Sequence, residues 1–280
     1  MKRALLGALV GGGIAVLGAG VANAAETSGN DGLLSGTQGL VSVDLPVTVS
    51  GNGISVIGDS SSQGAETSTP APAAAPASAS TSGDDAAASG SQALVSVSVP
   101  VTVSGNGISV IGDSTSQGAE TTAAPAPAPA GEATTSGDDS ILGGTQGIVS
   151  VAVPVTVSGN SVSVIGDSQS QDAATTASSG SGSTGSGDAA TSGDDAIAGG
   201  SQVQAPVSVP VTVGGNAISV IGDSSSDGAT TEVAGGSGSG ASQGTTSGDD
   251  GILGGTQVLA PVTAPITAGG NAISVIGDSE

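Results

Sequence analysis

The feature that most constrains this chain is a five-fold internal repeat. An S-G-[ND]-D opening begins at Ser28, Ser82, Ser136, Ser192 and Ser247, so that successive starts lie 54, 54, 56 and 55 residues apart. From each start to a closing G-D-S there are 33 residues, and no copy carries an insertion. A fixed period of this kind is typical of chains that build one small unit several times.

The repeats alternate with spacers of a different composition. The first two spacers are rich in Ala and Pro, and the last two are rich in Gly and Ser. Such tracts favour extended polyproline II or flexible coil and carry no signal for folding. We therefore expect repeats at 28–60, 82–114, 136–168, 192–224 and 247–279, joined by flexible linkers at 61–81, 115–135, 169–191 and 225–246.

Each repeat contains a pattern that predicts β-structure. In the first copy, apolar residues at 41, 43, 45, 47 and 49 alternate with Ser42, Asp44, Pro46, Thr48 and Ser50. This period of two, with β-branched residues on the apolar side, is typical of a strand with one apolar face. A second apolar run, Ile54-Ser55-Val56-Ile57, follows after Gly51-Asn52.

The Gly-Asn pair between the two runs predicts a β-hairpin with a two-residue turn. The predicted register places Val49 opposite Ile54 and Val47 opposite Val56. Prolines at the polar positions of the first run each remove a ladder donor and favour an edge or interrupted strand. The candidate turn residues are Gly51, Asn52, Gly105, Asn106, Gly159, Asn160, Gly215, Asn216, Gly270 and Asn271.

A single hairpin of this size is marginally stable in water. The fold class expected from the sequence is therefore mostly disordered and all-β, with five short hairpins that form transiently in the dilute monomer. The apolar face of each hairpin would be buried against another copy, another molecule or an interface.

Composition excludes several classes of function. The chain of 280 residues has no Cys, His, Trp, Tyr or Phe, and its formal net charge is −22. It therefore offers no imidazole base, thiolate, zinc-type site or aromatic platform for bases, and its charge repels phosphate. We predict no enzyme activity, no cofactor and no nucleic-acid partner.

The N-terminus has the three parts of a secretory signal peptide. Lys2 and Arg3 precede an apolar run over 4–21, and Ala22-Asn23-Ala24 follows it. This order predicts a signal peptide at 1–24, with cleavage after Ala24. We expect a secreted protein at the cell wall or cell surface, with no membrane span in the mature chain, because no second apolar stretch approaches the length of a span.

Two short motifs resemble functional signatures. The block I-S-V-I-G-D-S resembles the nucleophile block of the G-D-S lipases and esterases, which would make Ser60, Ser114, Ser168, Ser224 and Ser279 nucleophiles. That chemistry needs a histidine, which this chain lacks. The run Leu45-Pro46-Val47-Thr48-Val49 resembles a sortase signal, with Val where Gly is required.

Acidic residues recur at two places in the repeats and raise the question of calcium. The pairs Asp84-Asp85, Asp138-Asp139, Asp194-Asp195 and Asp249-Asp250 open the later repeats, and Asp59 and its equivalents close them. Calcium prefers oxygen ligands, but no D-x-D-x-D-G loop is present. A solvated charge cluster is the expected structure, and catalysis by a pair of carboxylates lacks a pocket-forming neighbour.

The repeats resemble the domain of the chaplins, secreted surface proteins of filamentous bacteria. The segment 202–216, QVQAPVSVPVTVGGN, follows the order of the chaplin strand and its Gly-Asn turn, and 217–222 supplies the second strand. The resemblance implies a structural protein that assembles into amyloid-like fibres at air–water interfaces. Two departures are the missing aromatic segment and the residues at the usual cysteine, which are Ser50, Ser104, Ser158, Gly214 and Gly269.

The function expected from these observations is that of a secreted structural cell-surface protein. Its repeats would self-associate through strand edges, as amyloid-like assemblies at interfaces, and give surface hydrophobicity or adhesion. Its partners would be itself and air–water or cell-wall surfaces. The alternative is a soluble acidic secreted protein that binds calcium or basic partners and does not assemble. Because 24 acids face 2 basic residues, acid and salt should favour assembly by reducing repulsion.

Overall fold

The computed structural model describes most of the repeated part of the chain. It places 14–16, 25–28, 37–69, 79–85, 87, 90–123, 133–179, 189–235, 244–253 and 255–280. These residues contain strands, turns and bends and no helix, which confirms the all-β class. Accordingly, no helix long and apolar enough to cross a bilayer occurs among the placed residues.

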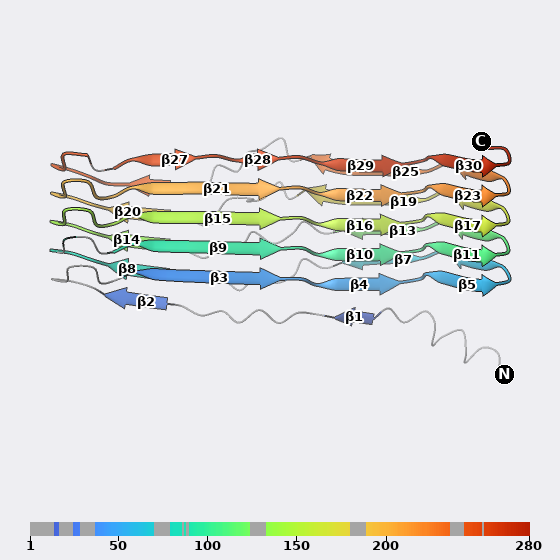
Figure 1. Cartoon of the computed structure of the whole chain (residues 1–280), viewed down its shortest axis with the longest axis horizontal. Helices are drawn as coiled ribbons and strands as arrows, with labels where there is room; N and C mark the ends of the chain where they lie inside the picture. Colours follow the sequence, from blue (N-terminus) through green and yellow to red (C-terminus); the bar gives the residue numbers. More distant parts are fainter. Residues whose placement is uncertain are drawn as a thin grey trace.

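The repeats are stacked as five coils, and each strand pairs with the equivalent strand of the next coil (Figure 1). Pairing is parallel and in register: Val101 lies opposite Val47 on one side and Val155 on the other. Identical sequence positions therefore form straight rows along the stack.

The first three strands of each coil run one after another and form what we call the front layer. The first of them forms a row from β3 (Gln38–Asp44) through β9 (Gln92–Ser98), β15 (Gln146–Ala152) and β21 (Gln202–Ser208) to β27 (Gln257–Leu259) and β28 (Val262–Thr263). The second forms a row from β4 (Val47–Ser50) through β10 (Val101–Ser104), β16 (Val155–Ser158) and β22 (Val211–Gly214) to β29 (Ile266–Gly269). The third forms a row from β5 (Gly53–Ile57) through β11 (Gly107–Ile111), β17 (Ser161–Ile165) and β23 (Ala217–Ile221) to β30 (Ala272–Ile276).

Three further rows form the back layer, on which the chain returns. The first contains β6 (Ser60–Gln63), β12 (Ser114–Gln117), β18 (Ser168–Gln171) and β24 (Ser224–Asp227). The second contains β7 (Glu66–Thr69), β13 (Glu120–Ala123), β19 (Ala174–Ser179) and β25 (Thr230–Gly235). The third contains β2 (Ala25–Ser28), β8 (Ala79–Ser82), β14 (Ala133–Ser136), β20 (Ala189–Ser192) and β26 (Gly244–Thr246).

The structure corrects the predicted hairpins. β4 and β5 flank Gly51-Asn52, but β4 pairs with β10 and β5 pairs with β11, so the register Val49–Ile54 and Val47–Val56 is not formed. The physical reason lies in the repeats. A hairpin satisfies one edge of each strand, whereas in-register stacking of five copies pairs both edges of every internal strand.

Parts of the predicted linkers also form strands. The stretch 61–81 begins within β6, continues through β7 and ends within β8. The Ala/Pro and Gly/Ser tracts at 70–78, 124–132, 180–188 and 236–243 lie outside the described residues. The prediction of a largely disordered monomer is not confirmed, because the described part of every repeat belongs to the stack.

The period-two pattern is present, but its polar side faces the interior. In the third coil the side chains of Gln146, Ser150, Thr156 and Ser158 are buried between the layers, while Val149 is 39% exposed. The repeated prolines share the inward orientation: Pro46, Pro100 and Pro210 are buried in the two-residue breaks between strands. Their carbonyls still accept hydrogen bonds from the next coil, as in Val101 N–H to Pro46 at 2.8 Å.

Small side chains allow the two layers to pack closely. Gly159, in the front layer, has a φ of +66°, and a Cβ placed on it would lie 2.6 Å from the Cβ of Ala173 in the back layer. The same contact joins Gly105 to Ala119 and Gly215 to Ala229. The glycine of the Gly-Asn pair is therefore required both by the bend and by the thickness of the coil.

The predicted signal peptide lies mostly outside the described residues. Within it, only β1 (Ile14–Val16) is placed, and it pairs antiparallel with β4 (Figure 1). The prediction of cleavage after Ala24 therefore stays a prediction.

Candidate interaction surface

The outer side of the front layer is a continuous apolar surface, which we call the front face. In each coil it begins at the residue after the repeated position of the Gln ladder and takes every second residue, as in Val149, Val151, Val155 and Val157 of the third coil. It continues on the third strand, where Ile54 is 75% exposed and Ile108 is 40% exposed. Apolar side chains that a globular protein would bury are thus displayed to the outside over the length of the stack.

The front face carries no charge at the positions that the structure describes. Asp44 is the one acid in the front-layer strands, and it shares the inward orientation of its buried equivalent Ser98. The outer side of the back layer is different: Glu66 and Glu120 are exposed there and lie opposite one another in adjacent strands. The acids of the back layer are therefore separated from the apolar surface by the thickness of the coil.

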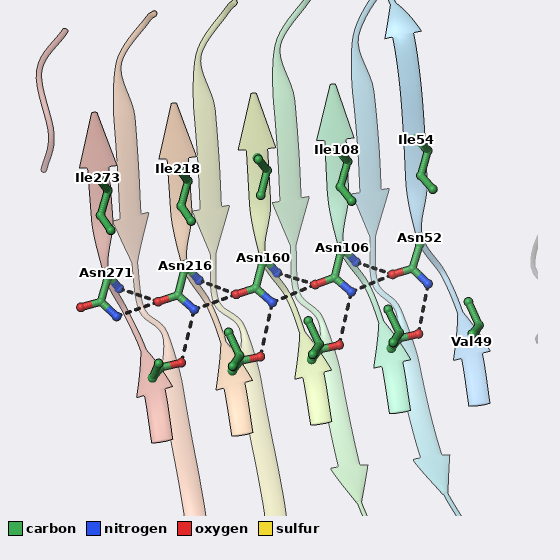
Figure 2. A pocket seen from close by; sticks show the side chains of 15 residues that line it. Val49, Asn52, Ile54, Asn106, Ile108, Asn160, Asn216, Ile218, Asn271 and Ile273 are labelled. Atoms are coloured by element: carbon green, nitrogen blue, oxygen red, sulfur yellow. Dashed lines mark hydrogen bonds between the residues drawn. The ribbon is translucent and has the colours of Figure 1, made fainter. Parts of the chain in front are cut away.

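An asparagine ladder crosses the front face at the bend between its second and third strands (Figure 2). Asn160 Nδ2 donates to Asn106 Oδ1 at 2.9 Å, and Asn160 Oδ1 accepts from Asn216 Nδ2 at 2.7 Å and from Asn216 N–H at 3.1 Å. The same contacts join Asn52 to Asn106 and Asn216 to Asn271. Such ladders stabilise parallel in-register stacks because each amide pairs above and below.

The ladder forms the floor of an apolar groove of about 500 Å3. One wall is formed by Val49, Val103, Val157, Val213 and Ala268, and the other by Ile54, Ile108, Val162, Ile218 and Ile273. Figure 2 shows the floor and both walls as parallel rows from five coils. The groove therefore runs along the stacking direction.

A second ladder of amides lies inside the coil. Gln146 Nε2 donates to Gln92 Oε1 at 2.8 Å, and Gln202 Nε2 donates to Gln146 Oε1 at 2.7 Å. Beside it, Leu94 and Ile148 pack with alanines of the back layer in the one apolar cluster found among the buried residues that the structure describes. The interior is thus held mainly by polar ladders and small side chains.

The predicted turn residues lie at a bend of the coil. Each of the five glycines has a positive φ, between +60° and +67°, and each of the five asparagines belongs to the ladder. Their predicted role as hairpin turns assumed antiparallel pairing of the flanking strands, which instead stack in parallel on other coils.

The G-D-S serines face the interior in the first four coils. Ser60, Ser114, Ser168 and Ser224 are at most 4% exposed. Ser168 Oγ donates to the Ile218 carbonyl at 2.6 Å, and Ser224 Oγ donates to the Ile273 carbonyl at 2.8 Å. Serines with these contacts hold one coil to the next and are closed to a substrate.

The residues at the usual chaplin cysteine also face inward. Ser158 is fully buried and shares a hydrogen bond of 2.5 Å with Thr121 Oγ1 of the back layer. Gly214 replaces it in the fourth coil, where a Cβ would lie 2.7 Å from Thr175 Oγ1. A hydroxyl at this position therefore joins the two layers, whereas Gly214 only leaves room for Thr175, whose Oγ1 has no hydrogen-bond partner among the described residues.

The aspartates that follow the third front strand form a ladder of like charges. Asp113 N–H donates to Asp59 Oδ1 at 3.1 Å, and Asp167 N–H donates to Asp113 Oδ1 at 3.0 Å. Each carboxylate thus caps the next coil while standing one strand spacing from another carboxylate. Among the described residues, no three acids converge in a way that could hold a metal ion.

In the acidic turns that open the repeats, carboxylates also accept hydrogen bonds from the next coil. Asp194 Oδ1 accepts from Ser247 Oγ at 2.5 Å and from Asp249 N–H at 3.0 Å. These hydrogen bonds, that from Ser247 above all, lower the pKa of the half-buried Asp194 carboxyl. The carboxylate form of Asp194 therefore fits the stack better than the acid form.

Sequence reasoning predicted the Asn positions but missed both amide ladders and the orientation of the faces. A usable signal was present, since Gln and Asn occur at the same position of all five repeats although neither fits an apolar pattern. A polar residue repeated at the same position in this way indicates in-register stacking of the repeats, with identical side chains above one another.

Comparison with known proteins supports the chaplin resemblance. A stretch of 101 residues is 37% identical to Chaplin-B of Streptomyces coelicolor, and the match covers 28% of this chain and 43% of that protein. The chain thus spans less than half the length of this curated relative. No family model matches the chain, and no solved structure matches it. The similarity is distant and partial.

Proposed function

We propose that this chain is a secreted structural protein of the cell surface that coats an interface and self-associates. The single observation that carries the proposal is the uncharged apolar front face, which extends over all five coils. Such a face is stable only when air, a hydrophobic solid or another apolar surface removes it from water. The similarity to Chaplin-B supports the assignment to a surface protein.

The back layer would keep the outer side of the coat hydrophilic. Its outer side carries Ser, Thr, Gln and the exposed Glu66 and Glu120, so it stays hydrated when the front face is adsorbed. The protein would therefore lie flat with its strands parallel to the interface. The result is a monolayer that reverses the wetting of the surface it covers.

Self-association would proceed through strand edges, as in other stacks of parallel strands. The in-register rows of like residues provide a template in which any further coil of the same sequence pairs with itself. Repulsion between acidic molecules opposes this step, so acid and salt should quicken it.

The test is adsorption of the mature chain to hydrophobic and hydrophilic solids, read by a quartz microbalance and by the contact angle of water. We expect a film on the hydrophobic solid that lowers the contact angle, and thioflavin fluorescence that rises after agitation with air. Calcium calorimetry on the same sample tests the alternative, a soluble acidic binding protein. Calcium heat without film or fluorescence would replace the proposed function with that alternative.

A further inference from the structure

The groove on the front face has a constant cross-section. At each level, one Val or Ala and one Ile or Val face each other across one Asn, and the levels are related by strand pairing in register. Five levels span about 19 Å, from four spacings of about 4.8 Å. A ligand that fits must therefore be linear and uniform along its length.

The floor of the groove has no free hydrogen-bonding group at the internal levels. A side-chain amide has two N–H donors and two acceptor sites on its oxygen. Asn106 uses its donors on Asn52 Oδ1 and the Val157 carbonyl, and its oxygen accepts from the N–H and Nδ2 of Asn160. A peptide strand or a sugar placed in the groove would leave its own polar groups unpaired, which is costly.

Charge narrows the class of ligand further. No lining residue is charged, so nothing in the groove holds an anionic or cationic head. The chain as a whole carries −22, which repels anionic amphiphiles. What fits is an apolar chain that needs no hydrogen bond. A neutral head group is neither repelled by the acids of the chain nor attracted to them, so its binding depends on the groove alone.

We propose that this groove binds a single unbranched alkyl chain carried by an uncharged head group. The chain would lie along the asparagine ladder between the two aliphatic walls, with its head group beyond one open end. At the fifth level Ala268 replaces Val, which widens that end of the groove. The inference is independent of the proposed coat, since it concerns one groove and not the whole face.

The test uses n-alkyl maltosides of increasing chain length, from octyl to eicosyl, titrated below their micelle concentrations into the full chain and followed by calorimetry. The longest of these chains exceed the length of the five levels. Burial of about half of each added methylene should tighten binding about twofold per carbon. The gain should stop once the alkyl chain spans the five levels, about 19 Å. A plateau distinguishes a groove of fixed length from general adsorption, where affinity keeps rising with chain length.

A matched pair of variants locates the site. Val157→Thr with Val162→Thr places hydroxyls on both walls at the central level, and should weaken binding about tenfold. Val149→Thr with Val151→Thr makes the same change on the front face outside the groove and should change binding less than twofold. Threonine keeps the β-branched shape, and circular dichroism checks that both variants retain the strands.

The opposite results would overturn the proposal. Equal losses in the two double variants, or affinity that rises without a plateau, would mean that alkyl chains adsorb anywhere on the front face. Absence of heat for every chain length, with dimers in sedimentation that are lost in Val157→Thr with Val162→Thr, would mean that the groove instead receives a second copy of this chain.

Discussion

The front and back layers are built from similar strands but end with opposite surfaces. Both turn small polar residues toward each other, as in Ser158 against Thr121. Outside, the front layer shows Val and Ile, whereas the back layer shows Thr, Gln and Glu. The comparison teaches that in a stack of similar coils the inward residues are those that form hydrogen-bonded ladders and let the two layers approach closely. The outward residues remain free to determine what the protein touches.

The difference follows from the geometry of the interior. Where Gly faces Ala across the two layers there is no room for a larger side chain. The large aliphatic side chains that do face inward, such as Leu94 and Ile148, lie against alanines of the back layer. Hydroxyls and amides fit, and many of them find a partner in the same or the next coil, as Ser158 and Gln146 do. A few buried hydroxyls, such as Ser98 Oγ and Thr212 Oγ1, have no hydrogen-bond partner among the described residues. An apolar core, the usual source of stability, is here replaced by ladder hydrogen bonds and close contact between layers.

The largest expected loss of stability comes from a substitution at the contact between the two layers. Gly159→Ala forces a side chain into a positive φ and against Ala173 Cβ, and should destabilise the stack by about 3 kcal/mol. Gly147→Ala is the matched control, because the atom nearest to its new Cβ would be Gln92 O, at 4.0 Å. Chemical denaturation followed by circular dichroism measures both, and equal losses would contradict the close packing of the layers.

The next effect is on the asparagine ladder at the front. Asn160→Asp replaces the donor to Asn106 Oδ1 with an acceptor and should cost about 2 kcal/mol at neutral pH. Asn271→Asp, at an exposed position bonded to one neighbouring asparagine, should cost clearly less. Denaturation midpoints for the two variants give the comparison, and an Asn271→Asp loss as large as that of Asn160→Asp would show that the ladder does not act as a unit.

A charge placed on either face separates the roles of the two layers. Val164→Lys, at a position 41% exposed on the front face, should reduce adsorption to a hydrophobic solid at least severalfold. Thr122→Lys makes a comparable change at an exposed position of the back layer and should leave adsorption unchanged. Both should alter the free energy of unfolding by about 0.5 kcal/mol or less, so a microbalance reads the surface effect alone.

The smallest expected effect is the change in stability at low pH that comes from Asp194. The pKa of Asp194 is lowered in the folded chain by the Ser247 hydroxyl, so its contribution to stability is present above its unfolded pKa and is lost as pH falls through the folded pKa. Asp194→Asn keeps an acceptor oxygen and removes the titration. The stability advantage of the wild type over Asp194→Asn at about pH 5 should therefore shrink at about pH 2. An advantage that grows in acid would reverse the assigned sign.

The sequence by itself determined the repeat, the β-class and the period of two. These follow from local chemistry: alternation of Val with Ser or Thr predicts a strand, and the Gly51-Asn52 pair predicts a reversal or bend between two strands. The resemblance to chaplins was also readable from the order of residues, and the comparison with Chaplin-B confirms it as distant similarity.

Only the tertiary structure decided which strands pair and which side faces in. Val49 is compatible both with pairing to Ile54 in a hairpin and with stacking on Val103, since either arrangement puts apolar beside apolar. The local sequence pattern does not distinguish the two arrangements, because the difference lies in hydrogen bonds between residues about 54 positions apart, such as that from Asn106 to Asn52. Those bonds between coils, together with the Gly–Ala contacts that bring the two layers close at the bend, favour the stack in which the valines face outward and form the front face.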